Sequence, residues 1–294
     1  MNIPLNYLPA FGKVFSPLVM NNLAQNGYSG YLSEVCSNSR IKDQIDTTIS
    51  LRQFLEDLYN ILQKNYRYEY IYKNVIAKKI LLGKHSLNTS HMLTEFRVGK
   101  CKADVVIVNG TSTAYEIKSE YDSFTRLKQQ IHTYLDVFDF VNVITSDAQA
   151  DKLKYLLPEV VGLLVLTKNN SISTIREAIS NVDNIKLDIL FDSLRKTEYM
   201  RVIREHYGSL PSVPNTLIYK VCRSLFCQIP NKVAHSLAIN ALRERSNSEV
   251  LRKFIDVAPD SLTAYAMSIC TEKTQMEQLM DRFELSIDSI MTTN

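Results

Sequence analysis

Hydrophobic and polar positions repeat with two different periods along the chain, and the change of period marks the predicted elements. From residue 49 to residue 82 apolar side chains recur every three or four positions, which predicts two amphipathic helices, the second from Tyr68 to Leu82. From residue 92 to residue 118 the pattern is typical of strands joined by tight turns at Gly99-Lys100 and Asn109-Gly110. These strands are expected at Met92–Val98, Ala103–Val108 and Ala114–Lys118.

Helical and strand patterns then alternate as far as residue 175. This order is typical of a mixed α/β sheet that helices cover on both faces. The predicted elements are a helix at Arg126–Phe138, a strand at Val141–Thr145, a helix at Ala148–Leu157, a strand at Val160–Thr167 and a short segment at Ser171–Ile175.

The two flanks of this block lack strand patterns. From Leu187 onward, prolines punctuate a series of predicted helices, and the first fifty residues are polar-rich and favour short helices or loops. We therefore expect three parts: an N-terminal helical or loop extension at residues 1–58, an α/β core at 59–182 and an all-α C-terminal domain at 183–294.

Composition excludes several classes of protein. Hydrophobic residues make up 45% and charged residues 22% of the 294 residues, which is ordinary for a soluble globular protein. No run of eighteen apolar residues predicts a membrane span, and the N-terminus lacks the pattern of a secretory signal, so we expect a cytoplasmic protein without a membrane partner. The phosphate-loop, dinucleotide-binding and nucleophile-elbow motifs are absent.

The net charge of +3 conceals an uneven distribution. Residues 60–135 contain twelve Lys/Arg against six Asp/Glu, a balance of +6, whereas the rest of the chain contains twenty-two against twenty-five, a balance of −3. A basic segment suits a polyanionic partner such as nucleic acid. A solvated basic face is the stronger alternative on charge alone.

Two carboxylates and an amine interrupt the apolar hairpin at residues 103–119. Asp104 opens the first strand, and Glu116 and Lys118 end the second, so antiparallel pairing brings the two carboxylates together at one edge of the sheet. Two carboxylates at close range suit a divalent cation such as Mg²⁺, with Mn²⁺ as a substitute. Lys118 is two residues after Glu116 and shares its face, where it can position water for attack on phosphorus.

This spacing resembles the PD-(D/E)xK nuclease superfamily, which includes restriction enzymes, junction resolvases and RecB-like nucleases. Asp104 is followed after eleven residues by Glu116-Ile117-Lys118, and the order of predicted elements matches the restriction-endonuclease-like core. Gln130 and Tyr134 stand where RecB-like members carry a Gln-x-x-x-Tyr motif. The run YEIKSEYDSFTRLKQQIHTYLDVFD is also similar to small bacterial nuclease-like proteins. The resemblance covers residues 68–179, and Ala103 replaces the proline of the motif.

The resemblance implies further site residues. Ile117 would offer a backbone carbonyl to the metal, and Gln130 and Tyr134 would steady the site and the nucleic acid. Many members carry an additional acid on the first helix, for which Glu69 is the first choice and Glu95, on the first strand, the competitor; either could instead be a surface carboxylate paired with a lysine. The candidate contacts to nucleic acid are Tyr134, Arg126, Lys102 and, on the same helix as Arg126, His132.

The function expected from the sequence is that of a Mg²⁺-dependent nuclease, with DNA as the favoured substrate. The C-terminal helical domain would supply specificity, a surface for a protein partner, or contacts to a second copy of the chain. A nucleic-acid-binding or scaffold protein on the same fold that cuts nothing is the main alternative. Five tyrosines near residues 59–72 are expected to pack against a core edge in preference to stacking on bases.

Overall fold

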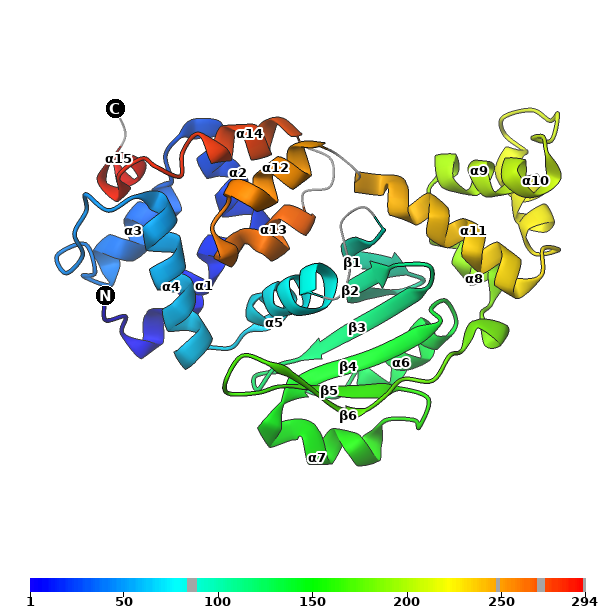
Figure 1. Cartoon of the computed structure of the whole chain (residues 1–294), viewed down its shortest axis with the longest axis horizontal. Helices are drawn as coiled ribbons and strands as arrows, with labels where there is room; N and C mark the ends of the chain where they lie inside the picture. Colours follow the sequence, from blue (N-terminus) through cyan, green and yellow to red (C-terminus); the bar gives the residue numbers. More distant parts are fainter. Residues whose placement is uncertain (84–88, 247–248, 269–272, 293–294) are drawn as a thin grey trace. The chain divides into compact units, whose positions relative to one another are not determined.

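The computed structural model describes residues 1–83, 89–246, 249–268 and 273–292 (Figure 1). The chain forms two units. Residues 1–78 and 248–294 make up the first unit, and residues 79–247 make up the second. The helical C-terminal segment that the sequence predicts at 183–294 is therefore divided between the two units, and the N-terminal extension belongs with the last part of the chain.

The second unit is built on a six-stranded mixed sheet whose strand order follows the chain, β1 to β6. The pairs β1–β2, β2–β3 and β5–β6 are antiparallel, and the pairs β3–β4 and β4–β5 are parallel. This confirms the predicted mixed α/β sheet. The strands are β1 (His91–Val98), β2 (Cys101–Val108), β3 (Ser112–Lys118), β4 (Phe140–Ser146), β5 (Gly162–Leu166) and β6 (Ile172–Arg176).

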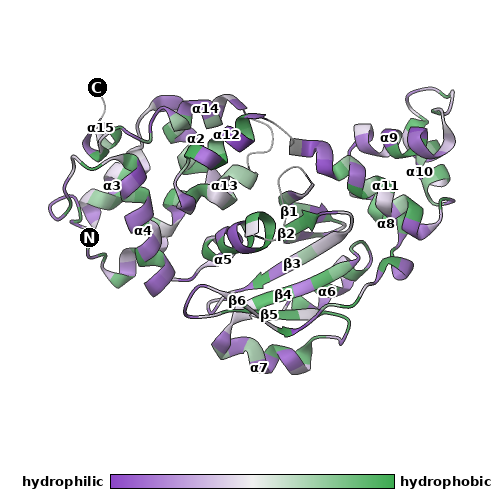
Figure 2. Ribbon diagram, in the orientation of Figure 1, coloured by the Kyte–Doolittle hydropathy of each residue, from purple (hydrophilic) through white to green (hydrophobic). Residues whose placement is uncertain are grey.

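Side-chain alternation gives the sheet two faces, and we define each face by its residues. The first face carries Val106, Ala114 and Val143, which belong to one buried cluster with the apolar sides of α6 (Leu127–Leu135) and α7 (Asp147–Leu156). The strands are among the most hydrophobic parts of the ribbon (Figure 2). Both helices connect parallel strands, as expected for crossovers between β3, β4 and β5.

The second face of the sheet carries the alternate residues, among them Tyr115, Asn142 and Leu164. Residues of η3 (Ala77–Leu82) lie near this face, because Lys79 and Ile80 line a cavity together with these strand residues. The sequence predicts an unbroken helix from Tyr68 to Leu82. The structure instead has α5 (Glu69–Ile76) followed by the π-helical turn η3.

Four helices complete the second unit and pack their apolar sides into the same cluster as the first face. Ser112 Oγ and His235 Nε2 lie 2.8 Å apart, both buried, and tie the last of these helices to the start of β3. Among the described residues after Leu187 no strand joins the sheet, which confirms the helical C-terminal region. The helices are α8 (Leu187–Asp192), α9 (Lys196–Tyr207), α10 (Ile218–Phe226) and α11 (Asn231–Arg243), with short 3₁₀ turns η4 (Val182–Asn184) and η5 (Glu244–Ser246).

The first unit is helical and joins the two ends of the chain. Tyr70 Oη donates to Ser261 O (2.7 Å), Ala264 N donates to Asn74 Oδ1 (2.8 Å), and Ser50 forms an isolated antiparallel bridge with Ser286. Its helices are η1 (Leu5–Tyr7), α1 (Leu8–Gly12), η2 (Lys13–Phe15), α2 (Pro17–Asn26), α3 (Gly30–Asn38), α4 (Leu51–Asn65), α5, α12 (Glu249–Val257), η6 (Asp260–Leu262), α13 (Thr263–Ser268), α14 (Lys273–Met280) and α15 (Ile287–Met291). Within the described part of the chain, no helix combines the length and apolar character that crossing a membrane requires.

Candidate active site

The register of the β2–β3 hairpin brings Asp104 and Glu116 together. Val105 pairs with Tyr115, and the next residues along the two strands are Asp104 and Glu116, whose side chain lies on the first face with α6. Asp104 Oδ2 accepts a hydrogen bond of 2.7 Å from the backbone N–H of Ile117. Asp104 is therefore held against β3 by the residue that separates Glu116 from Lys118.

Glu116 and Lys118 form a buried ion pair. Lys118 Nζ lies 2.7 Å from Glu116 Oε1, and it also donates to Gln130 Oε1 at 3.1 Å. The exposed fractions of Glu116 and Lys118 are 1% and 8%. Because α6 follows β3 and packs on the first face, its residue Gln130 can reach this pair. The structure thus brings together Asp104, Glu116, Lys118 and Gln130.

The Tyr134 hydroxyl has one proton to donate and contacts two acceptor oxygens. Its Oη lies 2.8 Å from Glu116 Oε2 and 2.5 Å from the backbone oxygen of Lys102. One O–H can donate to only one of these oxygens at a time. If the proton points to Lys102, the contact with Glu116 is satisfied only when Glu116 itself is protonated and donates to Tyr134. The network therefore has room for one additional proton on Glu116.

The electrostatic environment agrees with this proton count. Burial raises the pKa of Glu116, and the charge and hydrogen bond of Lys118, with hydrogen bonds from Tyr134 and Gln130, offset that rise only in part. Burial and the neighbouring Glu116 carboxylate likewise raise the pKa of Tyr134, so its hydroxyl stays protonated at neutral pH. Burial thus shifts both Glu116 and Tyr134 toward their neutral forms.

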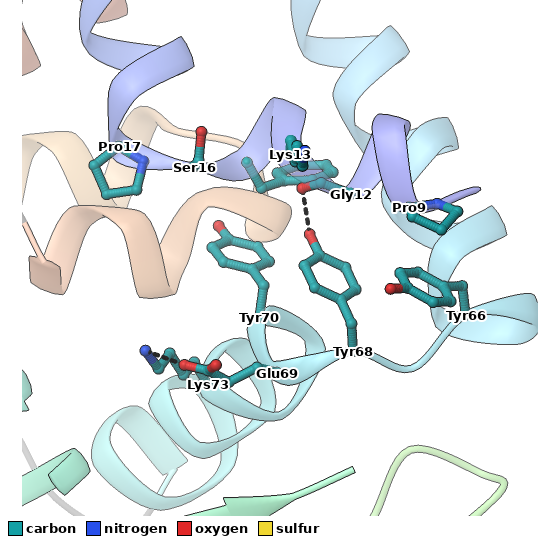
Figure 3. Close-up of a pocket in the computed structure, with 11 residues that line it drawn as sticks. Pro9, Gly12, Lys13, Ser16, Pro17, Tyr66, Tyr68, Glu69, Tyr70 and Lys73 are labelled. Atoms are coloured by element: carbon teal, nitrogen blue, oxygen red, sulfur yellow. Dashed lines mark hydrogen bonds and ion pairs between the residues drawn. The ribbon is translucent and has the colours of Figure 1, made fainter. Parts of the chain in front are cut away.

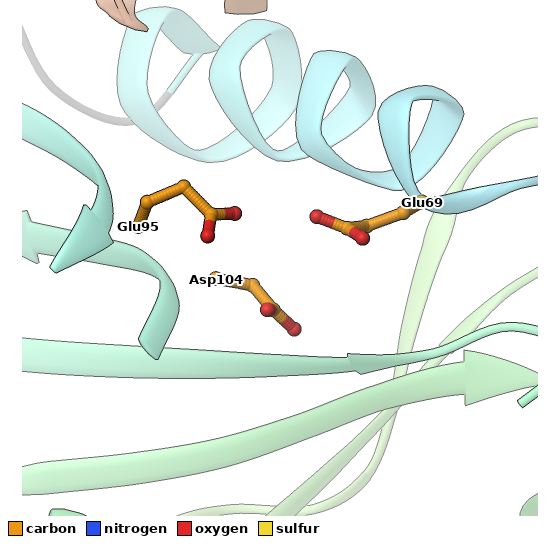
Figure 4. Close-up of side chains that lie close together, drawn as sticks. All are labelled: Glu69, Glu95 and Asp104. Carbon is orange, nitrogen blue, oxygen red and sulfur yellow. The ribbon is translucent and has the colours of Figure 1, made fainter. Parts of the chain in front are cut away.

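Glu95 lies on β1, the other neighbour of β2, next to Asp104. The β1–β2 register pairs Thr94 with Val105 and Phe96 with Ala103, which puts Glu95 level with Asp104. Carboxylate oxygens of Glu95 and Asp104 approach within 4.8 Å, and the two side chains turn toward the same space (Figure 4). Glu95 has a φ of 53°, a left-handed conformation that is uncommon for a residue other than glycine. One row of the sheet thus carries three carboxylates, those of Glu95, Asp104 and Glu116.

The remaining predicted site residues lie on α5, α6, β2 and β3. Glu69, the first choice for the additional acid, begins α5 in the first unit and forms an ion pair with Lys73 at 2.5 Å. Arg126 is the exposed N-cap residue of α6, and His132 is exposed on the same helix. Lys102, on β2, has an exposed side chain 3.9 Å from Glu95. The Ile117 side chain is buried on the second face, so only the backbone of this residue is close to the site.

A second cluster of interest is a row of tyrosines in the first unit. Tyr66, Tyr68 and Tyr70 lie one after another with nearly parallel rings (Figure 3); successive centroids are 5.3 Å and 6.2 Å apart. They line a cavity of about 380 Å³ together with Lys13 and Lys73. Packing accounts for part of the row, as the sequence predicts, since hydroxyl groups are tied to backbone oxygens, as in the 2.6 Å bond from Tyr68 to Gly12. The half-buried ring faces that line the cavity are a feature that the sequence did not predict.

The chain is similar to a known family, to one phage protein and to one solved structure. A family model described as bacteriophage P4 protein cII matches residues 62–265, a range that contains the sheet and every candidate residue named above except Lys13. Protein cII of Enterobacteria phage P4 is 31% identical over 70 residues, which make up 24% of this chain and 26% of the phage protein. The match thus spans about a quarter of that relative's length. Among solved structures, a Silicibacter pomeroyi protein of unknown function is 17% identical over 41% of this chain and 82% of its own, with a TM-score of 0.29.

Proposed function

The chain belongs to the family of the bacteriophage P4 protein cII, and we propose that it is a metal-dependent nuclease with a restriction-endonuclease-like core of the PD-(D/E)xK type. One observation carries the proposal. Asp104 on β2 accepts a hydrogen bond from the backbone N–H of Ile117, which lies between Glu116 and Lys118 on β3, and Gln130 and Tyr134 of α6 hydrogen-bond to that charged pair.

The oxygen donors fit a hard divalent cation. Asp104 and Glu116 would hold Mg²⁺, or Mn²⁺ in its place, with the Ile117 carbonyl and one further carboxylate, Glu95 or Glu69, completing the protein ligands. When bound, the ion would supply charge stabilisation and lower the pKa of a bound water. Glu116 must release Lys118 and Tyr134 before it can act as a ligand. Lys118, freed from Glu116 but still held by Gln130, would then orient the attacking water.

DNA is the proposed substrate, because the site lies in the basic stretch of residues 60–135. Lys102 and Arg126 are exposed and would contact phosphates. The tyrosine row of the first unit, with Lys13, would offer ring faces to unpaired bases. We propose that the helical C-terminal region supplies a surface for a protein partner or for a second copy of the chain.

A different observation favours the alternative, a nucleic-acid-binding or scaffold protein that does not cleave. Both carboxylate oxygens of Glu116 already have hydrogen-bond partners, and only 1% of the residue is exposed. A closed ion pair of this kind also suits a purely structural role. The two functions differ in whether a divalent ion can open the pair.

The deciding experiment incubates the purified full chain with linear and circular DNA, with and without Mg²⁺ or Mn²⁺. The nuclease predicts metal-dependent cleavage that falls by about 10²-fold or more in Lys118→Ala, the scale expected for a group that positions the nucleophile, while metal binding survives. Asp104→Asn should weaken both metal affinity and cleavage, because a charged ligand is lost. Lys154→Ala, which removes an exposed charge on α7, is the matched control and should cleave like the wild type.

Circular dichroism of each variant separates lost chemistry from lost folding. Suppose that the folded wild type cleaves neither single- nor double-stranded DNA or RNA with either metal, yet Lys118→Ala weakens nucleic-acid binding. Lys118 is then a phosphate contact in a binding protein, and the nuclease proposal is wrong.

A further inference from the structure

A cavity of about 420 Å³ lies on the second face of the sheet, on the opposite side of the strands from Glu116 and Lys118. Its volume falls within the range of small-molecule sites. It lies entirely in the second unit, between strand residues and the π-helical turn η3. Ile80, Leu164 and Ile172 give it apolar walls, and Lys79 and Glu177 are exposed members of its lining.

A row of three residues across neighbouring strands shapes this cavity. Tyr115 on β3 pairs with Asn142 on β4, and Asn142 pairs with Gly162 on β5. The Asn142 side chain lies across Gly162, since a Cβ added to Gly162 would be 2.0 Å from Asn142 Oδ1. The absence of a side chain at residue 162 is therefore what allows the Asn142 carboxamide to lie in this position.

The two polar side chains of the row are largely buried and lack protein partners. Asn142 and Tyr115 are each 7% exposed. Within the described residues, no hydrogen bond engages the Asn142 carboxamide or the Tyr115 hydroxyl. Both groups line the cavity, so a ligand that enters it can form hydrogen bonds with them in place of water. The nearby Thr174 and Ser171 add further hydroxyls to the same lining.

We propose that this cavity binds a planar heterocycle of the nucleobase type, as a free nucleoside or nucleotide. A carboxamide offers a donor and an acceptor side by side, and this pair matches the edge of a base, as in the bidentate contact of asparagine with adenine. The apolar walls suit the faces of a flat ring, and Tyr115 offers one further hydrogen bond. Lys79 and Glu177 suit the phosphate and the hydroxyl groups of the attached sugar.

The lining of the cavity does not suit a metal ion. A metal would require clustered carboxylates or imidazoles, and the lining holds a single carboxylate, that of Glu177. The site does not depend on the proposed nuclease activity, because it uses other residues on the other face of the sheet. Its ligand would bind without a divalent metal.

The test is isothermal titration calorimetry of the full chain with adenosine, guanosine, cytidine and uridine and their monophosphates, in the absence of divalent metal. We expect at least one of these to bind and to raise the melting temperature. Asn142→Ala should weaken binding about tenfold or more, the loss that follows from leaving a base edge without its hydrogen bonds. Tyr115→Phe should weaken it less.

Asn142→Asp keeps the shape of the side chain but replaces the donor with an acceptor, so it should lose the preferred base even if Asn142→Ala fails to fold. Ser173→Ala is the control, since Ser173 lies on β6 but pairs with Val165, on the first face. Absence of binding by every nucleoside and nucleotide at millimolar concentration overturns the proposal, as does binding that Asn142→Asp and Tyr115→Phe leave unchanged. Cleavage by the Asn142 variants should equal that of the wild type, so this result and a failure of the nuclease proposal are separable.

Discussion

The two faces of the sheet handle buried polar groups in opposite ways. On the first face, Glu116, Lys118, Gln130 and Tyr134 hydrogen-bond to one another, and both carboxylate oxygens of Glu116 have partners inside the protein. On the second face, Asn142 and Tyr115 line a cavity without a hydrogen-bond partner among the described residues. The same strands, β3 and β4, carry both arrangements.

This difference shows that burial alone does not identify a binding site. A buried, satisfied network has to be opened before a ligand can enter it, and the opening costs free energy. A polar group that lines a cavity without a protein partner is already available, so a ligand can form hydrogen bonds with it without breaking any inside the protein. The first face is thus expected to bind its ligand only after the Glu116–Lys118 pair opens, and the second face directly.

The largest expected effect tests how strongly the first face depends on its internal pairing. Lys118→Met removes the cation but leaves the Glu116 carboxyl group buried, which should lower the free energy of unfolding by about 3–5 kcal/mol in urea titrations at pH 7. Lys102→Met is the matched control, because its exposed ion pair with Glu95 should contribute less than about 1 kcal/mol.

The double variant Glu116→Gln/Lys118→Met completes the cycle. Because both charges are removed together, most of the stability should return. A double variant as unstable as Lys118→Met alone would mean that Lys118 acts by packing, and the description of the first face as a self-satisfied ion pair would fail.

An intermediate effect is expected from Gly162→Ala on the second face. The new Cβ would lie 2.0 Å from Asn142 Oδ1 and 2.9 Å from the backbone nitrogen of Ala178, so both must shift, at a cost of about 1–3 kcal/mol. In an Asn142→Ala background the first clash is absent, and the same substitution should cost less. Equal costs in the two backgrounds, measured by denaturation, would show that Asn142 does not lie across Gly162.

The smallest effect is a difference in pH dependence between the faces. Burial raises the pKa of Glu116, so the folded chain binds this proton more tightly than the unfolded chain does. The contribution of Glu116 to stability is therefore present at low pH and declines as pH rises from the ordinary glutamate value through the raised one, by at most about 1.4 kcal/mol per pH unit.

Glu116→Gln should remove this decline, and Asn142→Ala should leave it intact, since an asparagine does not titrate. Unfolding free energies measured at intervals from about pH 4 upward give the comparison. If the Glu116→Gln and wild-type curves stay parallel, Glu116 carries no extra proton in the folded chain.

The sequence predicted the sheet and the charged cluster well, because both depend on local signals. The Asn109-Gly110 turn determines the β2–β3 register, and the register brings Asp104 to Glu116. The four-residue spacing of Gln130 and Tyr134 puts both on the side of α6 that faces the sheet. The position of Glu95 level with Asp104 also follows from the predicted turn at Gly99-Lys100.

The cavity on the second face and the division into two units could not be predicted, because both depend on contacts between residues far apart in the sequence. Asn142 interrupts an apolar strand, a signal of a buried polar group, but its cavity requires Gly162 on the next strand and η3 from a distant part of the chain. The hydrophobic periodicity likewise does not predict the division into two units, because the helices from both ends of the chain have ordinary amphipathic patterns. Contacts such as the 2.8 Å ion pair between Arg52 and Glu284 join positions that lie far apart in the sequence.

The discontinuous first unit has a consequence for how the chain acquires its structure during synthesis. Residues 1–78 leave the ribosome long before residues 248–294, with which they form one unit. The apolar sides of α2 and α4 that pack against α14 and α15 therefore stay exposed to solvent while the second unit is made. The second unit, uninterrupted in sequence, can form first. The nascent N-terminal helices therefore expose apolar surface that is prone to aggregation until the last part of the chain is made.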